Sequence, residues 1–157
     1  MASPAEQHMR LAIRLAEESV ARGGGPFGAV VVRSGTVVAT GANRVVVDRD
    51  PTAHAEVVAL RAAAQAVGSH VLTGTEVYAS CEPCPMCLGA LLWARVDRVW
   101  FGASRHDAAA AGFDDARLYD ELALPLAARR LPSAALLAGE AQRPFAAWRA
   151  FGPRVPY

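Results

Sequence analysis

Residues 75–104 read TEVYASCEPCPMCLGALLWARVDRVWFGAS, and the elements that this stretch predicts indicate an α/β protein. Residues 75–80 and 96–104 are short runs with valine and aromatic residues, which favour buried strands. Residues 85–95 between them predict a helix that begins with proline, a residue well tolerated in a first turn. Consecutive strands joined by a helix run parallel in one sheet, so we expect these two strands to be parallel.

The preceding half of the chain predicts a helix, a hairpin and a second helix. Residues 5–22 mix apolar and charged residues in the pattern of a surface helix. Two β-branched runs, 29–33 and 36–41, flank a Ser-Gly turn and predict an antiparallel hairpin. Residues 53–67 are rich in alanine and predict a strong helix, with Thr52 as its N-cap.

The last third of the chain predicts more helix and one further strand. Residues 107–122 are mostly helical in pattern, residues 133–139 could form a strand, and residues 144–151 predict a final helix. This order of elements predicts a mixed sheet with helices on both of its faces. The length of 157 residues is enough for one compact domain with a core.

Composition and charge exclude several classes of protein. Apolar residues make up 53% of the chain and charged residues 20%, an ordinary globular balance. The net charge is +1 and the arginines are scattered, so we expect a small-molecule partner and no nucleic acid. No apolar run approaches the roughly 20 residues of a membrane span. The N-terminus lacks the pattern of a signal peptide, so we expect a cytoplasmic protein with no membrane partner.

Three cysteines lie three residues apart, at positions 81, 84 and 87. An odd number of cysteines in a reducing compartment argues against disulfides and favours metal binding or catalysis. Cys84 and Cys87 fall at the start of a predicted helix and share one of its faces. A helix N-terminus stabilises negative charge, which favours thiolates at this position. The pair therefore predicts two ligands of a metal site that needs a third donor.

The sequence PTAHAE at residues 51–56 supplies that third donor. His54 and Glu56 lie in the first turn of the helix predicted over residues 53–67. Residues two apart project from opposite sides of a helix, so both can serve one site only if that site lies beyond the helix N-terminus. We therefore expect two helix starts to converge, with His54 as a ligand and Glu56 beside the metal.

Three ligands of this kind predict a zinc site whose fourth position is left for water, which is the pattern of a catalytic zinc. Zinc makes such a water acidic near neutral pH, and Glu56 is placed to carry its proton. A closed structural zinc would need a fourth ligand, for which Cys81 is the nearest candidate. A buried inert thiol is the role that we expect for Cys81, because it lies at a strand end before Pro83. The alternative class of function is a non-enzymatic, zinc-stabilised binding module in which Glu56 would be dispensable.

The pairing of H-x-E at residues 54–56 with P-C-x-x-C at residues 83–87 matches the signature of zinc-dependent nucleobase deaminases. Four stretches resemble one branch of that group, the bacterial guanine deaminases of the cytidine deaminase-like superfamily. These stretches are GPFGAVVV, DPTAHAEVVALR, SCEPCPMCLGALLWAR and AGFDDARLYDEL. The similarity runs from about residue 24 to the C-terminus, and AGFDD and the terminal tyrosine point to the guanine branch.

The resemblance implies a three-layer α/β/α sandwich with a five-stranded mixed sheet, formed by a single domain over residues 1–157. It also implies a homodimer whose C-terminal segments are exchanged between subunits. The implied zinc ligands are His54, Cys84 and Cys87, and the implied proton shuttle is Glu56.

The resemblance also assigns five further site residues. Phe27 would pack against the base, and Asn43 and Asp115 would read the polar edges of the purine. Tyr157 would close the pocket, from the partner subunit in an exchanged dimer. Glu140 would be a second acidic residue near the site, with a role in the release of ammonia.

Other roles remain open for several of these residues. Phe27 could be a core residue, and Asn43 could serve only a turn. Asp114 could face the substrate in place of Asp115, or either could cap the helix that follows.

We therefore expect hydrolytic deamination of guanine to xanthine and ammonia, with Zn²⁺ as the cofactor and a nucleobase as the small-molecule partner. The alternatives are deamination of another purine, a nucleoside, an aminotriazine or adenosine in tRNA. The low net charge disfavours tRNA.

Overall fold

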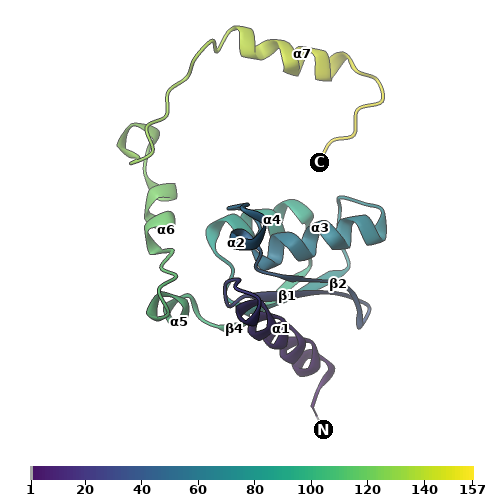
Figure 1. Ribbon diagram of the computed structural model, residues 1–157. Helices are drawn as coiled ribbons and strands as arrows, with labels where there is room; N and C mark the ends of the chain where they lie inside the picture. Colours follow the sequence, from purple (N-terminus) through teal and green to yellow (C-terminus); the bar gives the residue numbers. More distant parts are fainter. Residues whose placement is uncertain (1) are drawn as a thin grey trace. The chain divides into compact units, whose positions relative to one another are not determined.

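A computed structural model describes residues 2–157 and divides them into two compact units, one ending at Asp115 and one formed by Ala116–Tyr157. The first unit contains all the strands and most of the helices (Figure 1). Its elements are α1 (Pro4–Ala21), β1 (Gly28–Arg33), β2 (Thr36–Ala42), α2 (Val45–Asp48), α3 (Ala55–Val67), β3 (Thr75–Cys81), α4 (Pro85–Ala94), β4 (Arg98–Ala103) and α5 (Arg105–Ala110).

The sheet has the strand order β2-β1-β3-β4. β1 is antiparallel to both β2 and β3, and β3 is parallel to β4. These pairings confirm the predicted mixed sheet, the antiparallel hairpin and the parallel pair. The expected number of strands was wrong, because the described residues form a sheet of four strands and not five.

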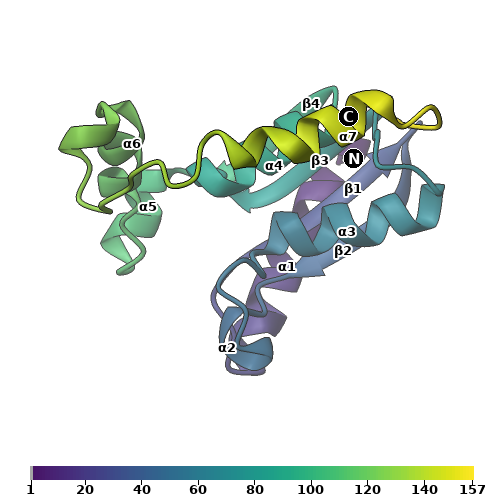
Figure 2. The same cartoon turned by 90° about the horizontal axis from the view of Figure 1, so that it is seen from above.

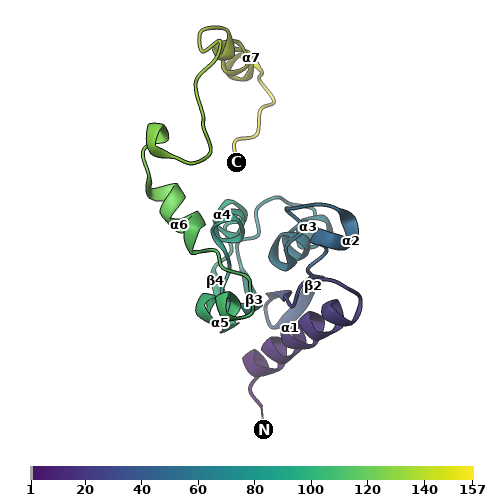
Figure 3. The same ribbon diagram turned by 60° about the vertical axis from the view of Figure 1, so that its left-hand side comes forward.

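Two separate cores show that the sheet is covered on both faces. Alternate residues of a strand point to opposite faces, so Val31 of β1 faces α3 and α4 whereas Val30 faces α1. Figures 1 and 3 show α1 on one side of the strands and α3 and α4 on the other. Seen from above in Figure 2, α3 and α4 lie along the same face of the sheet. The three-layer α/β/α arrangement is therefore confirmed.

The N-terminus of α3 is held close to β2 by a glycine. A Cβ atom added to Gly41 would overlap the carbonyl oxygen of Ala55 and lie 2.6 Å from the backbone nitrogen of Ala59. Only glycine allows the helix to approach the strand so closely. This contact fixes the position of the helix start that carries His54.

The predicted cap of α3 was wrong. His54 occupies the N-cap position, with extended backbone angles and no side-chain capping hydrogen bond. The Thr52 hydroxyl and backbone N–H instead donate to Asp50 Oδ1, at 2.7 and 2.8 Å. This local turn competes with a capping role for Thr52 and leaves His54 at the helix entrance.

The second unit is a series of short helices without a strand. It comprises α6 (Ala116–Ala123), η1 (Leu126–Ala128), η2 (Glu140–Gln142) and α7 (Arg143–Ala150). The predicted final helix is confirmed by α7. The strand considered for residues 133–139 is not formed, because alanine and leucine favour strands weakly and no neighbouring strand supplies hydrogen bonds to this segment.

None of the helices formed by residues 2–157 combines the length and the apolar character needed to cross a bilayer.

Candidate metal centre and active site

The starts of α3 and α4 bring together the three predicted metal ligands. His54 is the N-cap residue of α3, Cys84 is the N-cap residue of α4, and Cys87 lies in the first turn of α4. The Nδ1 atom of His54 lies 3.5 Å from the Sγ atoms of both cysteines. The three donor atoms all lie within 4.8 Å of one another.

This donor geometry fits zinc. With a Zn–S bond of about 2.3 Å and a Zn–N bond of about 2.0 Å, a tetrahedral ion holds its nitrogen and sulfur donors about 3.5–3.6 Å apart. The observed separation of 3.5 Å matches this value for both sulfurs. One imidazole and two thiols are also donors that zinc prefers. The arrangement supplies three protein ligands, as the sequence predicted.

Glu56 lies beside these ligands without belonging to the ligand group. Its side chain is 7% exposed, and the Cys87 thiol donates a hydrogen bond to Glu56 Oε2 at 3.3 Å. His54 and Glu56 are two residues apart, but both side chains reach the cysteines of α4 from the N-terminal end of α3. The structure therefore places the carboxyl group where the sequence predicted the proton carrier.

A hydrogen bond between the two ligand cysteines shifts their pKa values in opposite directions. A hydrogen bond with Cys87 is the largest influence on Cys84 and, with His54 and against the effect of burial, lowers the pKa of Cys84 to about 4. The same hydrogen bond, together with burial and the nearby Glu56 carboxylate, raises the pKa of Cys87. Cys84 therefore ionises before Cys87, which donates the hydrogen bond between them.

The pKa values of His54 and Glu56 at this centre are also raised above their ordinary values. The hydrogen bond with Cys84 raises the pKa of His54 against the opposing effect of burial. Burial raises the pKa of Glu56, and hydrogen bonds from its own backbone and from Cys87 oppose the shift only in part. A carboxyl group whose pKa moves towards neutrality is suited to accept and return a proton.

Cys81 is placed differently from the two ligand cysteines. It is buried at the end of β3, and its thiol donates to the carbonyl oxygen of Ser104 at 3.6 Å. Burial raises the pKa of Cys81, which keeps it protonated. Among the described residues, the potential metal-binding group contains His54, Cys84 and Cys87 and does not include Cys81. This arrangement favours an open zinc site over a closed one.

Two of the predicted substrate-binding residues lie in the first unit near the ends of β1 and β2. The Phe27 ring packs edge-on against Phe113, with ring centroids 5.0 Å apart and an interplanar angle of 86°. Asn43 is buried and directly follows β2. The backbone N–H of Arg44 donates to the Ala53 carbonyl oxygen at 2.9 Å, so Asn43 lies beside the segment that leads into His54.

The Asp115 carboxyl group is within electrostatic reach of Cys84 at the metal centre. Burial raises the pKa of Asp115, and the negative charge of Cys84 raises it further. Asp115 is partly buried whereas Asp114 is exposed. These features favour Asp115 as the residue that faces a ligand.

Glu140 and Tyr157 belong to the second unit. Glu140 forms an ion pair with Arg143 at 3.3 Å, and the Tyr157 side chain is exposed. The placement of the two units relative to each other is not determined, so the site roles of these two residues stay predictions.

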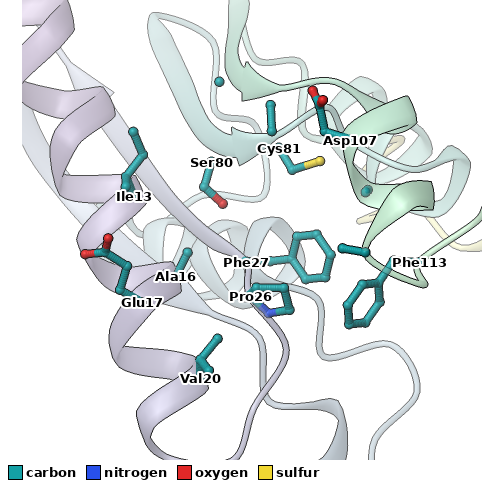
Figure 4. Close-up of a pocket in the computed structure, with 14 residues that line it drawn as sticks. Ile13, Ala16, Glu17, Val20, Pro26, Phe27, Ser80, Cys81, Asp107 and Phe113 are labelled. Atoms are coloured by element: carbon teal, nitrogen blue, oxygen red, sulfur yellow. The ribbon is translucent and has the colours of Figure 1, made fainter.

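An apolar cavity of about 440 Å³ is lined by residues of α1, of the ends of β3 and β4, and of α5. Figure 4 shows Ile13, Glu17 and Val20 of α1 along one side and Phe27 and Phe113 on another. Its lining includes Cys81 but none of the metal ligands. The contact between Phe27 and Phe113 was missed by the sequence reasoning, because nothing local to residues 27 and 113 indicates that they meet.

Comparisons with known proteins agree with this site. Residues 2–103 match the cytidine and deoxycytidylate deaminase zinc-binding region. The chain is 46% identical to a guanine deaminase of Bacillus subtilis over 97% of its own length and 98% of that protein. A crystal structure of guanine deaminase from Bacillus subtilis matches with a TM-score of 0.94 and covers 97% of this chain and 98% of the other. A tRNA-specific adenosine deaminase of Haemophilus influenzae is 40% identical over 72% of this chain and 69% of that protein.

Proposed function

Because the chain belongs to the cytidine and deoxycytidylate deaminase family of zinc-binding proteins, we propose that it is a zinc-dependent guanine deaminase, which hydrolyses guanine to xanthine and ammonia. The observation that carries this proposal is the His54–Cys84–Cys87 group with Glu56 3.3 Å from Cys87. Similarity to a guanine deaminase over nearly the whole chain supports the choice of substrate.

His54, Cys84 and Cys87 would hold the zinc ion at the meeting point of α3 and α4. When bound, zinc would acidify a water molecule and so provide a nucleophile near neutral pH. Glu56 accepts one proton from the attacking water and delivers it to the ring nitrogen next to carbon 2. It then accepts the second proton from the oxygen now bonded to carbon 2 and passes it to the departing amine, so that a carbonyl group remains at carbon 2. One water is consumed, the bond from carbon 2 to the exocyclic nitrogen breaks, and ammonia leaves.

The remaining site residues would bind and orient the base. The Phe27 ring gives an apolar surface for the purine, and stacking of this kind contributes about 1–3 kcal/mol per base. Asn43 donates to the purine carbonyl, and the Asp115 carboxylate accepts from ring N–H groups. Tyr157 closes the pocket, and Glu140 assists the release of ammonia.

Ammonia release from a panel of substrates tests this function. The zinc-loaded protein is incubated with guanine, guanosine, cytosine, adenine and the triazine ammeline. We expect guanine to give the highest kcat/KM. If neither guanine nor a close analogue releases ammonia, the substrate assignment is wrong.

A tRNA-specific adenosine deaminase is the second candidate, because a protein with that name shares 40% identity with most of this chain. The net charge of +1 disfavours it, since RNA binding depends on neutralising phosphates. Measurement of tRNA affinity at several salt concentrations separates the candidates. A dedicated tRNA enzyme shows tight binding that weakens steeply with salt, whereas we expect weak binding.

We also propose that the active protein is a homodimer that exchanges its C-terminal segments, and that it works in the cytoplasm. No residue of the described segment 116–157 is buried, and it carries many large apolar side chains, such as Leu136 at 85% exposure. A 42-residue segment (157 − 115) without a core is not stable by itself, so it must pack against another surface. Exchange between two copies would provide that surface.

Mixing two inactive variants tests the exchange. Glu56→Gln lacks the proton carrier, and Tyr157→Ala lacks the terminal ring. In an exchanged dimer, a mixed pair contains one site with an intact Glu56 and an intact Tyr157, so co-expression restores activity. If each subunit uses its own C-terminus, no site in the mixture is complete and activity stays absent.

A further inference from the structure

The side-chain amide of Asn43 is fixed in one orientation. The residue is 8% exposed, and its Oδ1 atom accepts hydrogen bonds from the backbone N–H groups of Gly25 and Val45, each at 3.3 Å. Both partners are donors, so only the oxygen end of the amide can face them. The NH₂ end therefore points away from Gly25 and Val45.

The backbone of Asn43 is also held by two hydrogen bonds. Its N–H donates to the carbonyl oxygen of Phe27 at 3.0 Å, and its carbonyl oxygen accepts from Ser19 Oγ at 3.1 Å. Ser19 lies on α1 and is only 4% exposed. Asn43 thus makes four hydrogen bonds with four separate parts of the fold. The partners are Ser19 on α1, Gly25 and Phe27 before β1, and Val45 at the start of α2.

Close packing around Asn43 depends on two glycines. A Cβ atom added to Gly25 would lie 3.1 Å from Asn43 Cγ, and one added to Gly24 would lie 2.8 Å from the Asn43 carbonyl oxygen. Either addition would push the asparagine from its position. Gly24, Gly25 and Ser19 therefore form a cradle around Asn43, and we call these residues the Asn43 cradle.

We propose that Ser19 and Gly25 are positioning residues that hold the Asn43 NH₂ group towards the substrate, so that the site selects purines with an oxo group at carbon 6. The inference rests on the proposed function, in which Asn43 contacts the base. A 6-oxo purine accepts a hydrogen bond from this NH₂ group. A 6-amino purine presents a donor there, so two donors face each other and both lose a partner.

Loosening the cradle removes this selectivity. An amide that is free to turn about its Cβ–Cγ bond can present its oxygen to a 6-amino group as readily as its NH₂ to a 6-oxo group. The variants Ser19→Ala and Gly25→Ala loosen or displace the asparagine without removing its amide. Ser69→Ala is the matched control, because the Ser69 hydroxyl accepts only a local bond from Val71 N–H at an exposed position.

The experiment compares guanine with 2,6-diaminopurine, which keeps the 2-amino group and differs at carbon 6 and in the protonation of N1. The quantities are kcat and KM for guanine and the competitive Ki of 2,6-diaminopurine. The contribution of N1 is common to all variants and cancels when their Ki/KM ratios are compared. In both cradle variants we expect this ratio to fall about tenfold, the effect of one hydrogen bond, with kcat changed much less than KM. Ser69→Ala keeps the ratio of the unmodified protein.

Zinc content and thermal unfolding of each variant show whether it is folded. If Ser19→Ala does not fold, the Ki/KM ratio of Gly25→Ala alone tests the inference. Gly25→Ala adds only one methyl group, and it does so in a loop. An unchanged Ki/KM ratio in the folded cradle variants, with a raised KM in Asn43→Ala, overturns the inference and leaves the proposed function intact. Failure of the unmodified protein to deaminate guanine overturns the proposed function, and the inference with it.

Discussion

Glu56 Oε2 lies 3.3 Å from Cys87 Sγ, although 31 residues separate the two in sequence. This contact joins the proton carrier on α3 to the metal ligand on α4, and both side chains are buried. The distance places the carboxyl group next to the ligand set while leaving it outside the set. Substitutions at the centre should therefore separate metal binding from catalysis.

Glu56→Gln should abolish turnover and leave zinc bound. The amide keeps the size of the carboxyl group but cannot accept and return a proton, and loss of such a group lowers kcat by about 10²–10⁴-fold. Ammonia release and zinc content by mass spectrometry give the two readouts. Glu18→Gln, which removes only an exposed ion pair with Arg22, is the control and should keep full activity. Full ammonia release by Glu56→Gln would overturn the role of Glu56 as the proton carrier, whereas zinc binding without any turnover in the unmodified protein would support a binding module in place of an enzyme.

Cysteine substitutions should divide into two classes. Cys84→Ser and Cys87→Ser each remove a donor at the metal centre and should lower zinc content to well below one ion per chain. Cys81→Ser should keep a full complement of zinc, because Cys81 bonds to the Ser104 carbonyl and lies outside the ligand group. Loss of zinc from Cys81→Ser would indicate a closed, four-ligand structural site.

Removal of zinc should expose one reactive thiolate. The pKa of Cys84 is lowered to about 4, so Cys84 is ionised at pH 6, whereas the pKa values of Cys81 and Cys87 are raised. Brief alkylation of the chelator-treated protein at pH 6 should therefore modify Cys84 first, since the thiolate is the reacting form. Peptide mapping gives the modified site, and zinc-loaded protein is the control. Equal modification of all three cysteines, rising only above pH 8, would contradict the assignment.

Gly41→Ala should weaken both the fold and the metal centre. The added methyl group overlaps the Ala55 carbonyl oxygen, so the start of α3 and His54 must shift. Overpacking of this kind costs about 1–3 kcal/mol in the free energy of unfolding. Gly89→Ala in α4 is the matched control, because a Cβ atom there meets nothing within 4 Å and alanine favours helix. Chemical denaturation and zinc affinity check both variants, and equal behaviour of the two would contradict this packing argument.

The metal centre could be predicted from sequence because its residues have short, local spacings. His54 and Glu56 share one helix start, and Cys84 and Cys87 share another, so two local patterns defined the whole ligand set. The layers of the fold followed from apolar periodicity in the same way.

Other features depend on contacts that no local pattern records. The cradle around Asn43 joins residues 19, 25 and 43 through single hydrogen bonds between distant segments. The cap of α3 was wrong because Asp50 competes for the Thr52 hydroxyl. A fifth strand was also expected, but strand formation in residues 133–139 requires a neighbour that their own sequence does not specify.

The zinc ligands all precede residue 88 and the last strand ends at Ala103, whereas Asp115, Glu140 and Tyr157 come later in the chain. Asp115, Glu140 and Tyr157, which are proposed to complete the site, are thus encoded after all the metal ligands, whereas Phe27 and Asn43 are encoded before them. Mutations after residue 103 would alter the proposed contacts of Asp115, Glu140 and Tyr157 without changing a metal ligand, which would give this architecture a simple route to new specificities during evolution.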